Sequence, residues 1–245
     1  MVNTLMQNTI VLENVSVDIL EKKILSNISF KVNSNTPVCV FGKGSSGKST
    51  LLKTIIGLIK ISSGKIKINE TSIDNKKEIK IILDSFGMVF EKDALFDSLS
   101  VWENIMFKSL GKLSKQSLLK KSYELLLKVG LSRKDSHLYP AELSGGMRKR
   151  VAIARAISHD PKFLLLDEPT AGLDPVKTNM IFDIIKKLSS EMNITVLAVS
   201  SDVKGALNYF SEIVVLDQSK IHWKGRVSAF RRKPTRLISK LLQSF

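Results

Sequence analysis

The chain has 245 residues, of which 43% are hydrophobic and 25% charged. These values are typical of a soluble globular protein that is long enough for one large domain or two small ones. No apolar run approaches the ~18 residues that a membrane-spanning helix needs, and the first residues show no export signal. The single cysteine, Cys39, excludes an internal disulfide and fits a reducing compartment.

The charge is strongly positive, because 38 Lys and Arg against 23 Asp and Glu leave a net charge of +15. Such an excess favours polyanionic partners, including nucleic acid and acidic lipid surfaces. The lysines, however, are scattered singly and in pairs, and only residues 231–236, "RRKPTR", form a dense cluster. We therefore interpret the charge as a solvated surface and expect no specific nucleic-acid partner.

Two kinds of strand pattern occur along the chain. Residues 9–17, 28–32 and 65–69 alternate apolar and polar side chains, which predicts half-buried antiparallel strands near the N-terminus. Residues 37–41, "PVCVF", are apolar nearly throughout, which predicts a strand buried on both faces. Similar buried runs recur as "KFLLLD", "TVLAVS" and "EIVVLD", separated by helix-like sequence. This order predicts an α/β fold with a mostly parallel core sheet and helices on both sides.

The pattern from about residue 101 to residue 157 is helical instead. In "SKQSLLKKSYELLLKVG" the apolar residues lie near one stripe of a helix, and Gly130 is placed to end it. We therefore predict a helical subdomain inserted into the core that bears the sheets. The stripe consists of Leu118, Leu119, Leu125, Leu126 and Val129.

The most specific motif is "GKGSSGKST", which satisfies G-x-x-x-x-G-K-[ST] between a predicted strand and a predicted helix. Glycines let backbone N–H groups approach phosphate oxygens closely, and the helix N-terminus adds its positive dipole end. Lys48 is expected to reach the β- and γ-phosphates of ATP, and the Ser49 hydroxyl to bind Mg²⁺. The predicted nucleotide-binding residues of this loop are Gly42, Lys43, Gly44, Ser45, Ser46, Gly47, Lys48, Ser49 and Thr50.

A second motif, "FLLLDEPT", ends a predicted buried strand in two adjacent carboxylates. Asp167 is expected to lie beside Mg²⁺. Glu168 is expected to act as the general base that polarises the water attacking the γ-phosphate. Two adjacent carboxylates alone are equally consistent with a solvated turn, but they become specific when they follow a phosphate-binding loop.

A third motif, "ELSGGMRKRVAIARAIS", places Ser144, Gly145 and Gly146 at the start of a helix. A hydroxyl and exposed amides at this position make another anion site. Because the chain already has one phosphate-binding loop, a second anion site suggests that two molecules share each nucleotide.

The phosphate loop, LSGG and DEPT follow one another in this order along the chain, with "AGLDP" next, and together they resemble the motifs of the ATP-binding cassette (ABC) transporter ATPases over nearly the whole chain. The resemblance implies a P-loop NTPase fold and a head-to-tail pair of cassettes with two ATP molecules between them. Ser144, Gly145 and Gly146 of one subunit would close over the γ-phosphate held by Lys48 of the other, with Asp174 in the loop that links the two sites. It also implies a second cassette, most simply an identical copy, and a separate membrane permease at the cytoplasmic face of the inner membrane.

Within the family, "GMVFEKDALFDSLSVWENI" and LSGGM in place of LSGGQ most resemble the ATPase of the Mla-type lipid-transport systems, which serve the mammalian-cell-entry class of lipid carriers. This resemblance implies that the cassette energises phospholipid transport. It also implies that Ala94, Leu95 and Phe96 border the groove that receives a permease helix. The alternative is that Leu95 and Phe96 belong to an ordinary core, and for Phe96 the two interpretations are equally consistent with the sequence. The alternative is the ATPase of another ABC importer or exporter.

Four features depart from the family pattern. Glu91 stands where a glutamine usually binds Mg²⁺, and a carboxylate there lacks the amide donor and adds negative charge. Ser201 stands where a histidine usually contacts the γ-phosphate, and serine is shorter and never cationic. Ile19 replaces the aromatic residue that stacks on adenine, and Gly44 and Ser45 stand in the reverse of the usual order.

We expect these changes to slow ATP hydrolysis without abolishing it, because one lost transition-state contact typically costs ~10²–10³ in rate and the general base, Glu168, is intact. In the alternative interpretation, the chain is a degenerate partner that binds ATP and dimerises with little hydrolysis. A soluble ABC protein acting on nucleic acid is a further alternative, but the chain shows no coiled-coil insertion and no second cassette.

We interpret residues 1–245 as one cassette. The core and β-subdomain are assigned to residues 1–91 and 160–230, the helical subdomain to residues 92–159, and a C-terminal tail to residues 231–245. The tail is expected either to dock on the sister subunit or a small accessory protein, or to pack on its own domain. Its apolar residues at helical spacing are Leu237, Ile238, Leu241, Leu242 and Phe245.

Overall fold

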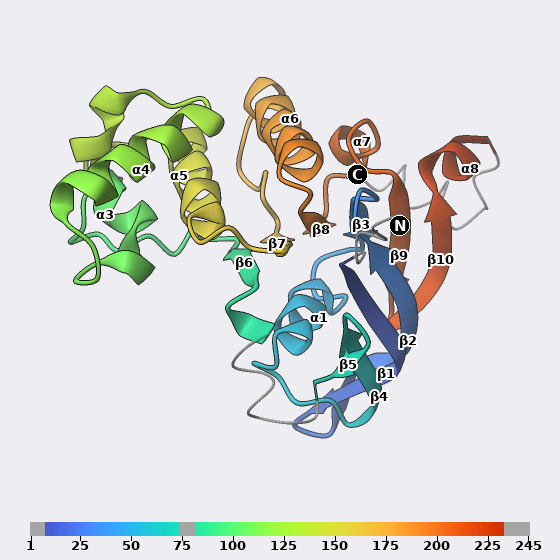
Figure 1. Cartoon of the computed structure of the whole chain (residues 1–245). Helices are drawn as coiled ribbons and strands as arrows, with labels where there is room; N and C mark the ends of the chain where they lie inside the picture. The colour runs from blue at the N-terminus through green and yellow to red at the C-terminus, as the bar shows by residue number, and fades with distance from the viewer. Residues whose placement is uncertain (1–7, 74–81, 233–245) are drawn as a thin grey trace, which may run out of the picture.

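Three strands whose residues are all buried, β3, β7 and β8, form the centre of the larger of two sheets. The computed structural model describes residues 8–73 and 82–232, and Figure 1 shows their arrangement. The strand order is β10-β9-β3-β8-β7-β6, and all neighbours are parallel except β10, which is antiparallel to β9. The prediction of a mostly parallel core sheet is therefore confirmed. The strands are β3 (Val38–Phe41), β6 (Phe86–Val89), β7 (Phe163–Asp167), β8 (Thr195–Ser200), β9 (Glu212–Asp217) and β10 (Lys220–Arg226).

The larger sheet separates two apolar cores. On β3, Val38 and Val40 pack into the core beneath α1 (Lys48–Ile55), whereas Cys39 and Phe41 pack into the core on the opposite face. This alternation follows from the period of two in a β-strand. Because both faces are covered, the strand needs apolar side chains at every position, which is the pattern that its sequence shows.

A smaller antiparallel sheet with the order β2-β1-β4-β5 packs on the α1 side (Figure 1). The three predicted N-terminal strands are present, and the first two are longer than predicted. β1 and β2 form a hairpin in which Ile19 pairs with Lys22. The strands are β1 (Thr9–Ile19), β2 (Lys22–Asn33), β4 (Ser63–Ile68) and β5 (Thr71–Ser72).

The predicted helical subdomain is a separate group of helices beside the edge strand β6 (Figure 1). On α4, the stripe predicted from the sequence faces inward: Leu119 is half-buried and the other four members are buried. Gly130 has a φ of +69°, so it ends this helix in the left-handed conformation that glycine adopts without a steric cost. The helices of this group are α3 (Val101–Ile105), α4 (Lys115–Lys128) and α5 (Gly145–Ile157), with short 3-10 turns η1 (Phe107–Ser109), η2 (Arg133–His137) and η3 (Pro140–Glu142).

Three further helices pack against the larger sheet or follow it. These are α6 (Pro175–Glu191), α7 (Val203–Ala206) and α8 (Val227–Arg232). No helix among the described residues is long and apolar enough to cross a membrane. Residues 233–245, which hold most of the tail that was expected to dock, lie outside the described part of the chain.

The sequence did not predict β6 and β10 as strands. β6 has only four residues and includes Gly87, where a Cβ would overlap the carbonyl oxygen of Ala156 in α5. Glycine is therefore required for the close approach of α5, and it weakens the strand signal. β10 is an edge strand of half-exposed and exposed residues, so it lacks the apolar run that marks the other strands.

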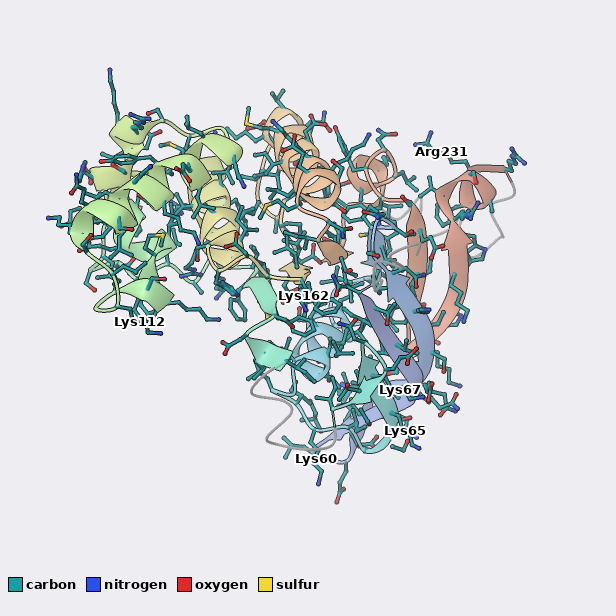
Figure 2. All side chains as sticks on the ribbon, viewed as in Figure 1. Lys60, Lys65, Lys67, Lys112, Lys162 and Arg231 are labelled. Atoms are coloured by element: carbon teal, nitrogen blue, oxygen red, sulfur yellow. The ribbon has the colours of Figure 1, made fainter. Side chains whose placement is uncertain are left out.

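The positive charge is spread over the surface. The basic side chains labelled in Figure 2 include Lys112 on the helical subdomain, Lys65 and Lys67 on β4 of the smaller sheet, and Arg231 on α8. Lys67 forms an ion pair of 2.7 Å with Glu13. This distribution agrees with the interpretation of the charge as a solvated surface.

Replacing Asn104 tests how firmly the turn before α3 is held. This fully buried side chain accepts a hydrogen bond from the Phe96 N–H (2.8 Å) and donates to the carbonyl oxygens of Phe96 (3.0 Å) and Leu99 (2.9 Å). Asn104→Leu leaves these groups without partners, so we expect the free energy of unfolding to fall by roughly 2 to 4 kcal/mol. Urea denaturation measures this loss.

The control is Gln116→Leu, which changes an exposed amide on α4 and should shift the unfolding free energy by less than about 0.5 kcal/mol. Equal losses in the two variants would contradict the assigned role of Asn104.

Candidate nucleotide site

The carboxyl ends of three neighbouring parallel strands, β3, β8 and β7, meet at one edge of the larger sheet. The strand register aligns Phe41 with Ser200, and Asp167 with Val199. Residues that follow these strands are therefore close in space although they are far apart in the sequence. The predicted site residues at this edge are loop 42–47, Asp167, Glu168 and Ser201.

The loop between β3 and α1 has glycine where the backbone requires it. A Cβ at Gly42 would overlap the carbonyl oxygen of Leu216, and Gly47 has a φ of +99° at the N-cap of α1. The first N–H groups of a helix have no partner within the helix and are available to an anion. The Ser46 hydroxyl is buried and has no hydrogen-bond partner in the described chain. A phosphate group fits this loop, because its oxygens supply the acceptors that these donors lack.

The reversed order of Gly44 and Ser45 has a structural cost. Ser45 has a φ of +61°, whereas a Cβ at Gly44 would meet no atom within 4 Å. The loop therefore needs a glycine more at position 45 than at position 44. A non-glycine residue in the left-handed region costs of order 1–3 kcal/mol.

The side chain of Lys48, the first residue of α1, folds back against the loop. This side chain is 7% exposed, and Nζ donates hydrogen bonds to the carbonyl oxygens of Gly42 (2.8 Å) and Lys43 (3.1 Å). The same ammonium group forms an ion pair with Glu168 Oε1 at 3.2 Å. The predicted phosphate-binding cation and the predicted general base are therefore in direct contact.

Ser49 and Asp167 form the second pair of the site. Ser49 Oγ donates a hydrogen bond to Asp167 Oδ1 at 2.8 Å. Burial raises the pKa of the Asp167 carboxyl, the charges of Glu168 and Glu91 raise it further, and the Ser49 hydrogen bond opposes the increase. Three carboxylates thus share one region, and a divalent cation between them and a nucleotide would relieve their repulsion.

No group of three or more His, Cys, Asp or Glu side chains within residues 8–73 and 82–232 is arranged to hold a metal by itself. This arrangement fits Mg²⁺, which is usually bound by one or two protein ligands together with substrate phosphates and water. Ser49, Asp167 and Glu91 would supply the protein oxygens. When bound, the ion would neutralise charge on the phosphates.

Ser201 contacts Glu168. Its backbone N–H and its hydroxyl both donate to Glu168 Oε2, at 2.9 Å and 3.1 Å, while Lys48 holds the other carboxylate oxygen. Glu168 itself has a φ of +46°, an uncommon conformation for a residue with a side chain. The predicted general base is therefore oriented at both oxygens.

Two further predicted residues, Ile19 and Thr50, flank the loop. Ile24 of β2 lies against Gly47, and Ile19 ends the neighbouring strand β1 with 39% of its surface exposed. Ile19 therefore offers an apolar surface near the loop, but no ring for stacking. Thr50 lies in α1, and its carbonyl oxygen accepts a hydrogen bond from the Thr54 hydroxyl.

Ser144 and Asp174 occupy equivalent positions in two helices. Ser144 is the N-cap of α5 and accepts from the Met147 N–H at 3.3 Å, and Asp174 is the N-cap of α6 and accepts from the Lys177 N–H at 3.0 Å. The Lys177 side chain links the two ends, because Nζ is 2.6 Å from Asp174 Oδ2 and Cδ would be 3.2 Å from a Cβ at Gly146.

No hydrogen bond or ion pair within the described residues joins loop 42–50 to residues 144–146. A single chain therefore brings together the loop, Asp167, Glu168 and Ser201, but it does not bring the signature residues to them.

Three residues that hold the segment carrying Glu91 were not predicted from the sequence. Asp93 forms an ion pair with Lys149 (3.0 Å), and Arg155 donates to the carbonyl oxygens of Asp93 (2.7 Å) and Ala94 (2.6 Å). Lys149 and Arg155 occur in "RKRVAIARAI" at positions that share a helix face with apolar residues. A cation on the apolar face of a helix signals a buried partner.

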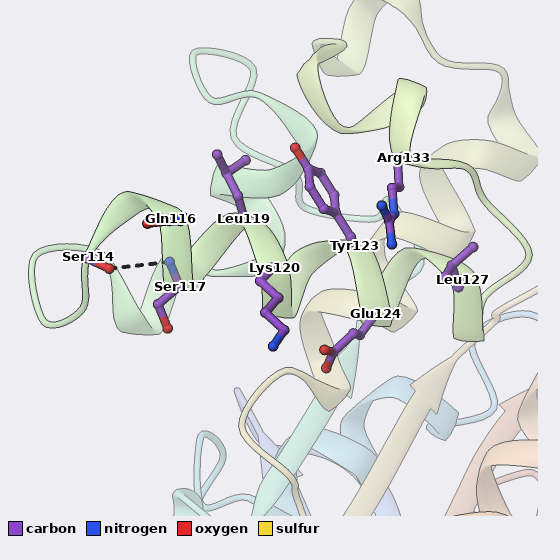
Figure 3. Close-up of a pocket in the computed structure, with 9 residues that line it drawn as sticks. All are labelled: Ser114, Gln116, Ser117, Leu119, Lys120, Tyr123, Glu124, Leu127 and Arg133. Carbon is purple, nitrogen blue, oxygen red and sulfur yellow. Dashed lines mark hydrogen bonds between the residues drawn. The ribbon is translucent and has the colours of Figure 1, made fainter.

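A hollow on the exposed side of α4 lies apart from these residues (Figure 3). Its lining includes Tyr123 and Arg133, whose guanidinium carbon lies 5.6 Å from the ring centroid. None of the predicted site residues lines it.

Comparisons with known proteins agree with this geometry. The profile of the ABC transporter family matches residues 25–171. The methionine import ATP-binding protein MetN of Lactobacillus johnsonii is 36% identical over 224 residues, which cover 88% of this chain and 64% of that protein. The glutamine transport ATP-binding protein GlnQ of Escherichia coli is 35% identical over 236 residues, covering 95% of this chain and 96% of that protein. The chain thus spans less than two thirds of the MetN protein.

Solved structures show the same fold. The dimeric structure of the bacterial ABC transporter cassette MJ0796 has a TM-score of 0.80 and 30% identity, covering 89% of this chain and 98% of that chain. A second structure of MJ0796, in a post-hydrolysis state bound to ADP and phosphate, has a TM-score of 0.79 and 29% identity, with the same coverage of both chains.

The fold and the site define an ATP-hydrolysing cassette that uses ATP and Mg²⁺. The chain belongs to the ABC transporter family. The expected class, fold and cofactors are thereby confirmed, whereas the two relatives above are named for methionine and glutamine transport and give no support to the Mla-type resemblance.

Replacing Ser45 by glycine should stabilise the protein without nucleotide. The left-handed conformation costs serine more than glycine, and the gain is partly offset by the greater freedom of glycine in the unfolded chain. We expect the free energy of unfolding of Ser45→Gly to rise by about 1 kcal/mol.

Urea denaturation measures the gain, and Gly44→Ala is the matched control. Its position is open and has an ordinary φ, so its change should be close to zero or slightly stabilising. A loss of stability in Ser45→Gly would contradict the strain assigned to Ser45.

Proposed function

We propose that this chain is the ATPase subunit of an ABC importer that works with a separate membrane permease. The observation that carries the proposal is the cluster in which Lys48 and Ser201 hold Glu168 while Ser49 holds Asp167. Phosphate-binding, metal-binding and base groups for phosphoryl transfer to water are within contact distance of one another.

Each side chain has a proposed role. Lys48 binds the β- and γ-phosphates, and Ser49, Asp167 and Glu91 hold Mg²⁺. Glu168 accepts the proton of the attacking water. When ATP enters the loop, its phosphates compete with Glu168 for the ammonium group of Lys48, which leaves one carboxylate oxygen available to the water.

Ser201 positions the base. A serine cannot supply the cationic contact that a histidine makes with the γ-phosphate. Its backbone N–H and its hydroxyl, however, both donate hydrogen bonds to Glu168. We therefore favour slowed hydrolysis over the alternative of a degenerate partner, because the residue that departs from the family pattern still supports the general base.

A pair of cassettes would complete the site. The signature residues Ser144, Gly145 and Gly146 and the loop residue Asp174 lie at neighbouring helix ends, apart from the phosphate loop of their own chain. We propose that they close on the nucleotide of a second copy, and the dimeric MJ0796 structure supports this arrangement.

The permease is proposed to bind beside Phe96. This ring is 42% exposed and stacks on Phe107, which is 46% exposed, with a centroid distance of 4.4 Å. Leu95 packs against the core instead, and Ala94 is exposed. Two exposed aromatic rings at the start of the helical subdomain are a surface that an apolar partner helix can cover. The chain would then lie at the cytoplasmic face of the membrane as a peripheral subunit.

Because the two relatives are named for methionine and glutamine transport, an amino acid is the first transported substrate to test. Phospholipid transport is the second candidate, because the "ALF" segment at residues 94–96 and Met147 after the signature glycines resemble the Mla-type ATPase. An accessory protein at the tail remains a proposal from the sequence. No specific nucleic-acid partner is proposed, since the basic side chains are dispersed.

Steady-state hydrolysis of Mg²⁺-ATP tests the assigned chemistry. Glu168→Gln removes the base, so the rate should fall about 10²–10⁴-fold. Ser201→Ala removes one of two hydrogen bonds to Glu168, so the rate should fall roughly tenfold. Ser201→His should raise the rate above that of the unmodified protein, because a cationic donor can reach the γ-phosphate.

The control is Ser190→Ala, which removes a hydroxyl that donates to the Lys187 carbonyl near the C-terminal end of α6, and it should leave the rate unchanged. If the unmodified protein binds ATP but hydrolyses it no faster than Glu168→Gln, the degenerate-partner alternative holds instead.

The permease surface is tested by Phe96→Asp. A charge in the proposed contact should reduce the share of the protein that sediments with the membranes of its host cells, by about tenfold or more, while ATP binding in solution is unchanged. Leu127→Asp, at an exposed position on α4, is the control. Unchanged membrane recovery of Phe96→Asp would contradict this surface.

A further inference from the structure

The turn that follows β6 is tied to α5 by two cations, the buried Lys149 and the half-buried Arg155. It carries Glu91, whose backbone leads directly into Lys92, Asp93 and Ala94. Asp93 and Ala94 have φ values of +61° and +50°, so the chain turns sharply here. The carbonyl oxygens of Asp93 and Ala94 accept hydrogen bonds from the Arg155 guanidinium at 2.7 Å and 2.6 Å.

Lys149 binds the same turn closer to Glu91. Its ammonium group donates to the carbonyl oxygen of Glu91 and lies 3.0 Å from Asp93 Oδ1. The Lys149 side chain is 5% exposed and that of Asp93 is 13% exposed. Arg148 adds a weaker contact, with Nε 3.9 Å from Asp93 Oδ2. A lysine is rarely buried unless its charge is paired, so this contact is a specific feature of the fold.

Glu91 lies next to the metal-binding carboxylate. β6 is the parallel neighbour of β7, with Val89 opposite Leu166, so Asp167 at the end of β7 and Glu91 just after the end of β6 lie at adjacent strand ends. A shift of the Glu91 backbone would therefore move one proposed Mg²⁺ ligand relative to the other.

We propose that Lys149 is a positioning residue for metal binding: its ammonium group fixes the backbone at Glu91, with Asp93 as counter-ion, and so holds the Glu91 carboxylate toward Mg²⁺ beside Asp167. The inference rests on the proposed role of Glu91. Because Lys149 lies in α5, the helix that begins with the signature residues also holds a proposed metal ligand of its own chain.

The test measures nucleotide binding rather than turnover. All variants carry Glu168→Gln so that the nucleotide persists. The Kd of a fluorescent ATP analogue is measured in EDTA and in Mg²⁺, and the ratio of the two values reports how much the bound metal contributes. Outer partners of metal ligands typically affect metal affinity 10–100-fold, so Lys149→Met should lower the ratio by about tenfold, as should Glu91→Ala.

Two comparisons and one control variant separate positioning from general stability. The double variant Glu91→Ala/Lys149→Met should show no further loss, because Lys149 acts through Glu91. Lys149→Arg keeps the cation and should restore the ratio to within about twofold. Lys121→Met breaks the exposed ion pair with Asp160 on the helical subdomain and should change nothing.

The results for Glu91→Ala and Lys149→Met decide whether the positioning role of Lys149 holds. If Glu91→Ala lowers the ratio and Lys149→Met does not, the positioning role is wrong while the role of Glu91 stands. If Glu91→Ala leaves the ratio unchanged, the proposed metal role of Glu91 is wrong, and the inference falls with it. Should Lys149→Met fail to fold, the variant Asp93→Leu/Lys149→Met removes both buried charges and is judged by the same ratio.

Discussion

The covering of the central strands on both faces is the constraint on which the rest of the structure depends. β3, β7 and β8 have apolar cores above and below them, so no polar side chain can lie along their length without a buried partner. Polar residues can therefore occur only at the ends of these strands. Because the strands are parallel, those ends form one row, and three separate pieces of sequence supply a single site. The chemistry of the protein thus follows from the packing of its sheet.

At these strand ends each charged side chain is paired with another group of the protein, and a bound nucleotide would replace some of these partners. Lys48 is held by two carbonyl oxygens and by Glu168, and Asp167 is held by Ser49. These contacts satisfy groups that would otherwise be buried and unpaired. The phosphates and the metal offer the same groups stronger partners. We therefore expect nucleotide binding to exchange one set of charge contacts for another.

Much of the fold and most of the site follow from local sequence. The buried runs predicted β3, β7, β8 and β9, and the strand-loop-helix context identified the phosphate loop, because these signals lie within short segments. β6 and β10 were missed, since one is shortened by a glycine that α5 requires and the other is an exposed edge. Lys149 and Asp93 were missed for a different reason: they are far apart in the sequence and are brought together only by the packing of α5 on the turn after β6. The contact between Ser201 and Glu168 was not predicted either, because it depends on the alignment of β7 with β8.

The single cysteine has a practical consequence. Cys39 lies on the central strand β3 with its side chain buried, and burial raises the pKa of its thiol well above the usual range. Thiol reagents act on the thiolate and need access to it, so the native thiol should stay unlabelled as long as the sheet is intact. One cysteine introduced on the surface would then carry a spectroscopic label in an otherwise natural chain. The appearance of a second reactive thiol would report that the central sheet had opened.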